Sequence, residues 1–151
     1  MSSLLSLELT DQTGSLRKLT DFGDKILIFI YPKDNTPGCT IENRDFSHYR
    51  EEFLKRGVEP IGLSSDSAES HSKFCNSQGL NTTLLSDPEK VLINELGAFG
   101  EKKMYGKVIG KGIIRSSFLV NTKTGEIEQE WRNVRAVGHA AKILREMQAS
   151  K

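Results

Sequence analysis

Residues 31–42, Tyr-Pro-Lys-Asp-Asn-Thr-Pro-Gly-Cys-Thr-Ile-Glu, join a short apolar run at 25–30 to a long polar segment with helical periodicity at 39–56. Two prolines and a glycine in this segment indicate a tight turn. A strand, a tight turn and a helix present Cys39 at the helix start, where unpaired backbone N–H groups and the helix dipole favour an anion. Because the thiolate is the attacking form of a cysteine, we predict that Cys39 is a reactive nucleophile.

The spacing of Pro32, Thr36, Cys39 and Glu42 resembles the signature of the peroxiredoxin family: Pro, three residues, Thr, two residues, Cys, then Glu. The likeness is greatest to the peroxiredoxin Q branch, also called bacterioferritin comigratory proteins. Segments 64–74, 97–106 and 115–118 also resemble that branch, so the likeness extends over nearly the whole chain. It implies a thioredoxin-like fold.

The resemblance also implies a function. The chain is expected to be a thiol-dependent peroxidase that needs neither a metal nor an organic cofactor, and to act on hydrogen peroxide and alkyl hydroperoxides. The Cys39 thiolate would attack one peroxide oxygen and become a sulfenic acid. Thr36 would help to place the peroxide, Pro32 would shield the sulfur, Arg115 would stabilise the charged groups, and Glu42 would hold the arginine.

Three of these residues have a simpler interpretation. Free cysteines are commonly buried as small apolar groups, although the Pro-Gly turn and polar neighbours of Cys39 argue against deep burial. Thr36 could be only a helix cap. Arg115 lies within the apolar segment 113–118, where an outward-facing residue on an alternating strand would have no role in catalysis.

The sequence departs from one common pattern of the branch. Many members carry a resolving cysteine five positions after the peroxidatic one, and here that position is Arg44. Cys75 matches an alternative resolving position seen in other members. A Cys39–Cys75 disulfide would require local unwinding, because disulfides join Cα atoms within about 7 Å. Alternatively, Cys75 is only structural and an external thiol resolves Cys39. Thioredoxin or a similar dithiol is the implied reductant.

Length and composition limit the other possibilities. A chain of 151 residues predicts one domain, residues 1–151. With 21 basic and 20 acidic residues, no general attraction to nucleic acid or to an anionic membrane is expected. The N-terminus lacks the pattern of a secretion signal, and two cysteines 36 positions apart fit a reducing compartment. We therefore expect a cytoplasmic protein, and a monomer, since an intramolecular disulfide needs no second subunit.

Strands alternating with helices predict an α/β domain with a mixed central sheet flanked by helices and an N-terminal β-hairpin. The expected strands and helices are a hairpin within 4–19, a strand at 25–31, a helix at 39–56, a strand at 58–63, a helix at 67–78 with Cys75 in its last turn, a helix from Asp87-Pro88 to about 97, a hairpin of 113–121 with 126–131, and a helix at 140–147. The glycine-rich and lysine-rich connection at 97–112 is unusually long, and is either functional or mobile.

Three other functions remain as alternatives. The first is a dithiol oxidoreductase, although no Cys-x-x-Cys motif is present. The second is a hydrolase in which His48 or His139 serves as base for Cys39. The third is a holdase or interaction domain without catalysis. The three histidines, including His71, lack metal-ligand spacing, so hydrogen-bonding or surface roles are expected.

Overall fold

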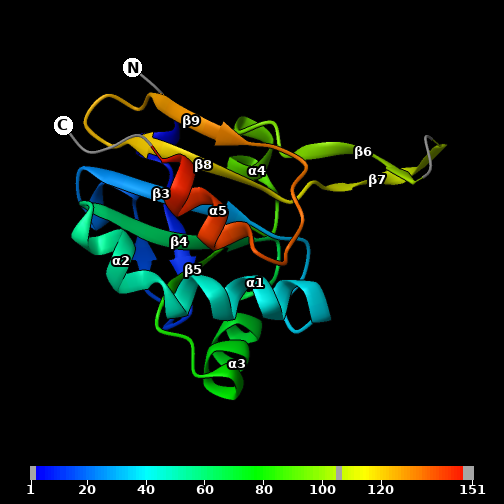
Figure 1. The fold of residues 1–151 in the computed structure, drawn as a ribbon, viewed down its shortest axis with the longest axis horizontal. Coiled ribbons are helices and arrows are strands. Elements are labelled where there is room, and N and C mark those ends of the chain that lie inside the picture. The colour runs from blue at the N-terminus through cyan, green and yellow to red at the C-terminus, as the bar shows by residue number, and fades with distance from the viewer. Residues whose placement is uncertain (1–2, 105–106, 148–151) are drawn as a thin grey trace.

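A seven-stranded mixed sheet forms the centre of the computed structural model, which describes residues 3–104 and 107–147 (Figure 1). Its strands are β1 (Leu9–Asp11), β2 (Leu16–Arg17), β3 (Lys25–Ile30), β4 (Val58–Ser64), β5 (Thr83–Ser86), β8 (Ser116–Asn121) and β9 (Ile127–Trp131). The strand order is β2-β1-β5-β4-β3-β8-β9. β3, β4 and β5 are parallel, whereas β1–β2, β1–β5, β3–β8 and β8–β9 are antiparallel. The expected mixed sheet with an N-terminal hairpin is confirmed.

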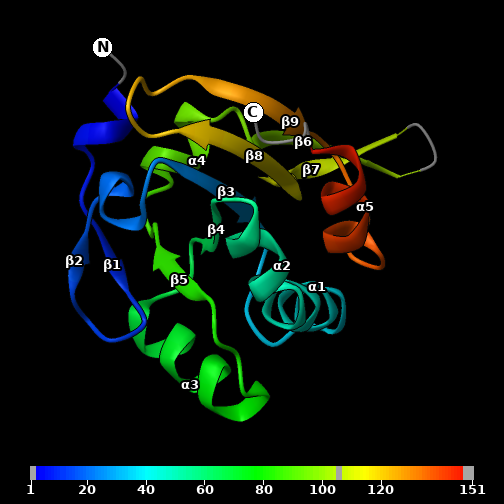
Figure 2. The ribbon, with the colours of Figure 1, turned by 60° about the vertical axis from the view of Figure 1, so that its left-hand side comes forward.

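Helices cover both faces of this sheet (Figure 2). One face carries α1 (Pro37–His48), α2 (Arg50–Lys55), α3 (Ala68–Gln78) and α5 (His139–Glu146). The other carries α4 (Val91–Glu95) and the 3-10 helices η1 (Ser3–Ser6) and η2 (Leu19–Phe22). The helix expected at 67–78 is confirmed, with the Ser67 hydroxyl accepting a hydrogen bond of 3.1 Å from the Ser70 N–H at its start. The C-terminal helix is confirmed as α5.

The central strand β3 separates two hydrophobic clusters. Ile26, Ile28 and Ile30 face the cluster under α4, while the alternate residues Leu27 and Phe29 face the cluster under α1 and α3. Successive side chains of a strand point to opposite faces, and a strand between parallel and antiparallel neighbours is buried on both. The unbroken apolar run therefore was correctly interpreted as a strand covered on both sides.

The single helix expected at 39–56 is wrong. The structure has two helices, α1 and α2, separated at Tyr49, whose backbone angles are φ −91° and ψ 5°. The apolar periodicity continues across the break, since Phe46 and Phe53 are both fully buried against the sheet. A pattern of buried side chains therefore could not reveal the break.

The region before α4 also differs from expectation. Strand β5 was not predicted, because it is only four residues long and its buried pair Leu84-Leu85 has no clear alternation. The helix expected to begin at Asp87-Pro88 begins at Val91 instead. The Asp87 carboxylate nevertheless caps it, accepting hydrogen bonds of 2.9 Å from the Val91 N–H and 2.8 Å from the Ile93 N–H.

Residues 99–104 and 107–112 of the connection expected at 97–112 have regular structure, and residues 105–106 lie outside the described residues. It forms an antiparallel ribbon of β6 (Phe99–Met104) and β7 (Lys107–Ile113), which extends from the body of the molecule (Figure 1). The strand expected at 113–121 is accordingly divided, with Ile113 ending β7 and residues 114–115 leading into β8. Glycine and lysine are uncommon in strands, which is why the sequence did not indicate this ribbon. The turn at 122–125 and the β8–β9 hairpin are as expected.

A search of the described helices for a membrane span is negative: within 3–104 and 107–147 none combines the necessary length and apolar character.

Candidate active site

Cys39 is the third residue of α1 and follows directly on the loop that leaves β3. The helix begins at Pro37, where proline's fixed φ and missing N–H are compatible with a first turn. Thr36 precedes it in extended conformation, with φ −92° and ψ 155°. Strand, turn and helix are therefore arranged around Cys39 as the sequence indicates, with the helix starting two residues earlier than expected.

The Thr36 hydroxyl does not cap α1. It donates a hydrogen bond of 3.0 Å to the Lys33 carbonyl, while the Thr36 carbonyl accepts one of 2.8 Å from the Thr40 N–H. The side chain thus closes the turn rather than the helix end. Pro32 is partly exposed in the same loop. The roles predicted for these two residues toward the peroxide and the sulfur stay predictions.

The expectation that polar neighbours keep Cys39 from deep burial is wrong. Cys39 is only 1% exposed and belongs to the apolar cluster that includes Tyr31, Phe46 and Phe74. The reason is its position on the inward face of α1, whereas Ile41, two residues later, is 42% exposed. The Asn43 side-chain amide donates a 2.9 Å hydrogen bond to the Cys39 carbonyl, a contact that the sequence did not predict.

Arg115 contacts Cys39 although it lies 76 positions later in the chain. Its Nη2 donates to Cys39 Sγ across 3.3 Å, and its Nη1 donates to Glu42 Oε1. Arg115 lies in the link between β7 and β8 rather than inside a strand, and its side chain is 17% exposed. The alternative of an outward-facing strand residue is therefore wrong. The structure brings together three residues that the sequence selected: Cys39, Glu42 and Arg115.

The electrostatics of this group depend on burial. Burial raises the pKa of Glu42 to about 7, although the charge and hydrogen bond of Arg115 act in the opposite direction. The carboxyl is fully buried, and its Oε2 has no hydrogen-bond partner among the described residues, so this oxygen is where a proton would sit. Burial alone would lower the pKa of Arg115, but Glu42 and Cys39 outweigh it and raise the pKa.

Gly38 makes room for the guanidinium. A Cβ at Gly38 would lie 3.3 Å from Arg115 Nη2 and 3.6 Å from the Ala136 Cβ. On the other side of the arginine, the Val134 N–H donates a 3.0 Å hydrogen bond to the Arg115 carbonyl. The loop between β9 and α5 therefore also fixes Arg115. No sequence pattern indicated a role for this loop, since its contacts with residues 38 and 115 are made only in the fold.

His139 does not act on Cys39 in this structure. Its Nε2 lies 2.8 Å from the Ser117 hydroxyl, while Nδ1 has no partner among the described residues. Burial lowers the pKa of His139 to about 4, with the charges of Arg115 and Lys142 acting in the same direction. Within 3–104 and 107–147, the hydrogen bonds of Cys39 include none to a histidine, so the geometry does not favour the hydrolase alternative.

Cys75 lies in the last turn of α3, as expected. It is partly buried and packs against the same apolar cluster that contains Cys39, and both thiols are free. Burial raises the pKa of Cys75 to about 11, and the charge of Asp34 contributes in the same direction. At neutral pH Cys75 is therefore a protonated thiol in this conformation.

Asp34, Asp66 and His71 form a cluster with the composition of a metal site, each offering one atom within 4.8 Å of the others. Their atoms are already engaged, however. Asp34 Oδ2 lies 2.7 Å from His71 Nδ1, and Asp66 Oδ2 accepts hydrogen bonds of 2.8 Å from the Asp34 N–H and 2.7 Å from the Ser64 hydroxyl. The geometry therefore favours a hydrogen-bonding role for His71 over metal ligation.

Comparisons with known proteins identify the family of this chain. Residues 3–129 match the model of the AhpC/TSA family. A putative peroxiredoxin of Helicobacter pylori, named bcp, is 47% identical over 120 residues, covering 80% of this chain and 78% of the relative. Peroxiredoxin Bcp of Xanthomonas campestris is 42% identical over 127 residues, covering 84% of this chain and 78% of the relative.

Solved structures show the same likeness. A structure of the Xanthomonas campestris bacterioferritin comigratory protein has a TM-score of 0.87 at 38% identity, covering 97% of this chain and 93% of that one. A Xylella fastidiosa PrxQ variant has a TM-score of 0.87 at 34% identity, covering 99% and 92%. The thioredoxin-like fold is thereby confirmed, and the chain belongs to the AhpC/TSA family, in its peroxiredoxin Q (Bcp) branch.

Proposed function

We propose that this thiol peroxidase reduces hydrogen peroxide and organic hydroperoxides with Cys39 as its peroxidatic residue. The observation that carries the assignment is the 3.3 Å contact between Arg115 Nη2 and Cys39 Sγ at the start of α1. A fixed positive charge beside a sulfur stabilises the thiolate, which is the nucleophile. The solved structure of the Xanthomonas relative concerns the alkyl peroxide reduction activity of that protein, which supports the same substrate class here.

The chemistry needs only the residues of the site. The Cys39 thiolate attacks the terminal oxygen of the hydroperoxide, an S–O bond forms and the O–O bond breaks. The other oxygen leaves as water or an alcohol after taking a proton, and Cys39 becomes a sulfenic acid. The Arg115 guanidinium faces the sulfur, so its N–H groups on that side can stabilise the negative charge that develops on the peroxide oxygens. Glu42 holds the guanidinium in this orientation through its own hydrogen bond.

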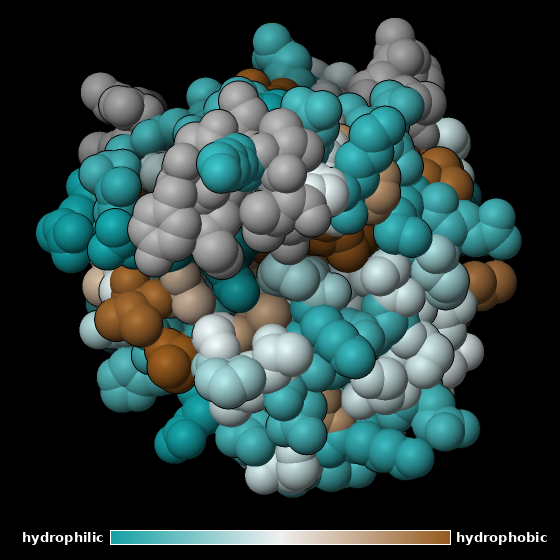
Figure 3. All heavy atoms as spheres, turned by 90° about the vertical axis from the view of Figure 1, so that its right-hand side faces the viewer, coloured by the Kyte–Doolittle hydropathy of each residue, from teal (hydrophilic) through white to brown (hydrophobic). Residues whose placement is uncertain are grey.

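Figure 3 shows the face of the molecule on the side of the β6–β7 ribbon. Hydrophilic residues predominate on this face, and apolar residues form small separate groups among them (Figure 3). Two exposed apolar side chains, Ile41 on α1 and Val137 in the loop before α5, belong to the segments that surround Cys39.

Cys75 is the proposed resolving residue. Its thiol would attack the sulfenic sulfur of Cys39, giving a disulfide and water. Structures of the Xanthomonas peroxiredoxin Q include serine variants of two cysteines that are 36 positions apart, the spacing of Cys39 and Cys75. Thioredoxin or a similar dithiol would then reduce the disulfide. We further propose that the protein works as a monomer in the cytoplasm. The alternative is resolution of Cys39 by an external thiol.

Intact mass after one equivalent of hydrogen peroxide tests this assignment. The wild type should lose about two mass units through a Cys39–Cys75 disulfide, and neither Cys39→Ser nor Cys75→Ser should do so. A gain of oxygen on Cys39 that is equal in wild type and Cys75→Ser would mean external resolution. If reduced wild-type protein shows no change, Cys39 is not peroxidatic.

A further inference from the structure

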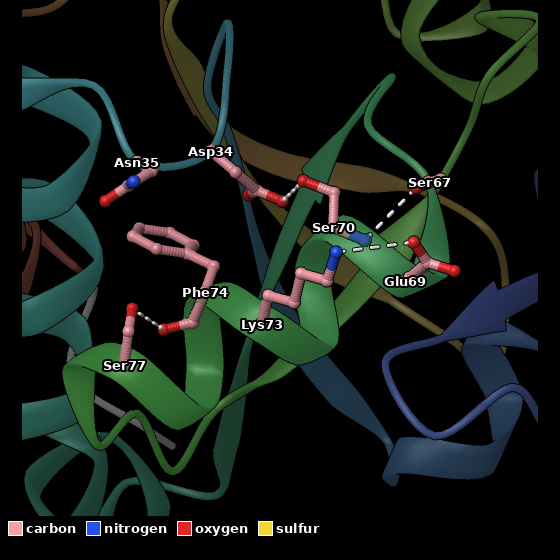
Figure 4. Close-up of a pocket in the computed structure, with 8 residues that line it drawn as sticks. All are labelled: Asp34, Asn35, Ser67, Glu69, Ser70, Lys73, Phe74 and Ser77. Carbon is pink, nitrogen blue, oxygen red and sulfur yellow. Dashed lines mark hydrogen bonds and ion pairs between the residues drawn. The ribbon is translucent and has the colours of Figure 1, made fainter.

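A buried hydrogen-bond network joins the loop before Cys39 to the helix that carries Cys75. Its centre is Asp34, which is 6% exposed. Asp34 Oδ1 accepts a 2.6 Å hydrogen bond from the Tyr31 hydroxyl, and Oδ2 accepts one of 2.8 Å from the Ser70 hydroxyl. His71 Nδ1 lies 2.7 Å from the same Oδ2. Figure 4 shows Asp34 on the loop and Ser70 on α3 facing each other across this junction.

The network is complete, which makes it rigid. His71 Nε2 lies 3.0 Å from the Leu85 carbonyl, which can only accept, so this nitrogen carries a hydrogen. The Tyr31 hydroxyl lies 3.4 Å from His71 Nδ1. His71 is fully buried, and the Asp34 N–H is held by Asp66. Fully satisfied buried networks hold their members in one arrangement.

Only the beginning of α3 is fixed in this way. Ser70 and His71 lie in its first turn, and Phe74 is its last buried residue. Cys75 is partly buried and is followed by exposed residues and by Gly79, whose φ is 63°. A turn with few buried contacts unfolds locally at low cost. The C-terminal turn can therefore unwind while the first turn stays attached.

Open space lies along the same side of the helix. A pocket of about 420 Å³ separates the loop at Asp34 and Asn35 from α3, with Phe74 and Ser77 on the helix side (Figure 4). Asp34 and Ser70, which are joined by a hydrogen bond, also line this pocket. Chain released from the last turn of α3 therefore has room to move toward the loop.

We propose that Asp34 is a positioning residue for the resolving step, fixing the first turn of α3 to the peroxidatic loop so that unwinding of the last turn alone delivers Cys75 to Cys39. The proposal rests on the proposed function, in which Cys75 resolves the sulfenic acid. In that step an S–S bond forms between the two sulfurs and the S–O bond of Cys39 breaks. The oxygen leaves as water, with the thiol proton of Cys75 completing it.

The network holds the first turn of α3 in place and does not hold the last turn in its helical form. Ser70 and His71 precede Cys75 by a full turn, and the buried Phe74 lies between them. Breaking the contacts of Asp34 therefore does not free the last turn. It weakens the attachment of the first turn of α3 to the loop instead, and so lowers the effective concentration of Cys75 at Cys39.

Rapid-quench measurements on the full chain test this proposal. Reduced protein is mixed with one equivalent of hydrogen peroxide, free thiols are alkylated at intervals, and intact masses report loss of the Cys39 thiol and formation of the disulfide. In Asp34→Asn we expect disulfide formation to slow by about tenfold, the effect of losing one hydrogen bond to a charged group. Loss of the Cys39 thiol should change by no more than about twofold, and excess peroxide should give more sulfinic acid.

Variants on α3 separate positioning from general damage to the fold. Ser70→Ala removes one donor to Asp34 and should slow disulfide formation in the same direction, and Ser70→Thr should restore it. Lys73→Ala is the matched control, because Lys73 is 77% exposed on the same helix and pairs only with Glu69 at 3.5 Å in the described structure. Its disulfide should form at the wild-type rate. If Asp34→Asn does not fold, the rates of disulfide formation in Ser70→Ala and Ser70→Thr test the proposal.

Two results would overturn the proposal. Disulfide formation at or above the wild-type rate in Asp34→Asn and Ser70→Ala would exclude an anchor. Removing the Asp34 charge also relieves the smaller cause of the raised pKa of Cys75, which favours faster attack, so slower resolution would not come from ionisation. Oxidation of Cys39 without any disulfide in the wild type would also exclude it. No oxidation of Cys39 would instead refute the proposed function.

Discussion

Arg115 Nη2 lies 3.3 Å from Cys39 Sγ, although the two residues are 76 positions apart in the chain. The same guanidinium donates to Glu42, which is one turn along α1 from Cys39. Carboxyl, guanidinium and sulfur therefore form one buried group in which each side chain orients the next. The reactivity of Cys39 should depend on all three.

Arg115→Met should slow the reaction of Cys39 with hydrogen peroxide by about 100-fold, the usual cost of removing one donor that stabilises developing charge. Arg115→Lys should recover little of this loss. A single ammonium cannot reproduce the planar fork that contacts both Cys39 and Glu42. Stopped-flow measurement of the second-order rate constant provides the readout.

Arg135→Met is the matched control for this pair of variants. Arg135 is exposed in the loop between β9 and α5, close in sequence to the residues that hold Arg115. Its replacement should leave the rate constant unchanged. A rate constant for Arg115→Met within threefold of the wild type would show that the arginine does not contribute.

Glu42 should make stability depend on pH in an unusual direction. Burial raises its pKa from 4.5 to about 7 in the folded protein, so the folded state binds the proton more tightly than the unfolded state. Its contribution to stability is therefore complete below pH 4.5 and is lost as the pH rises to about 7. Glu42→Gln should remove this dependence.

Urea unfolding at several pH values between about 4.5 and 7.5 checks the sign. The free energy of unfolding of the wild type should fall over this interval relative to that of Glu42→Gln. Glu51→Gln, at an exposed position of α2, should run parallel to the wild type. Parallel curves for wild type and Glu42→Gln would mean that Glu42 stays ionised throughout.

The sequence predicted those parts of the fold that depend on local patterns. The strand expected at 25–31 and the helix expected at 67–78 were both placed correctly, as β3 and α3. Cys39, Glu42 and Arg115 were selected by resemblance to a family motif, and their grouping in space agrees with that selection. The activity of the branch followed from the same motif.

The features that the sequence did not predict depend on distant contacts. Arg115 lies in a two-residue link because residues 99–104 pair with residues 107–113 in the β6–β7 ribbon. Cys39 is buried because it lies on the inward face of α1, which also carries Glu42, Asn43 and Phe46. Gly38 matters because Arg115 approaches it from another part of the chain. None of these contacts has a signal within its own segment.

Phe46 connects the stability of the core to the position of Cys39. Its ring stacks on that of Phe29, with centroids 4.0 Å apart and planes inclined by 5°, and it is fully buried on α1. Phe46→Ala should lower the free energy of unfolding by about 3–5 kcal/mol through lost burial and a cavity. Because Cys39 is on the same helix, the rate with peroxide should fall as well.

Chemical denaturation and stopped-flow rates on the same samples check both parts of this prediction. Ile41→Ala is the control, since Ile41 is on α1 but 42% exposed, and it should cost less than about 1 kcal/mol. An unchanged midpoint for Phe46→Ala would contradict the packing described here. A lower midpoint with an unchanged rate would show that α1 holds Cys39 without Phe46.

Cys75 should react slowly with alkylating reagents while the protein is folded. Burial, with a contribution from Asp34, raises its pKa to about 11, so only about one thiol in a thousand is ionised at pH 8. In Cys39→Ser, where Cys75 is the remaining cysteine, iodoacetamide labelling followed by intact mass should be about 100-fold slower in buffer than in urea. The labelling rate of the folded protein should continue to rise with pH beyond about 9, whereas the rate in urea should level off there, since a free thiol titrates near 8.5.

A plateau of the labelling rate near pH 9 in the folded protein would mean that the last turn of α3 is already open before peroxide arrives. Slow labelling would instead mean that oxidation of Cys39 must precede the exposure and activation of Cys75.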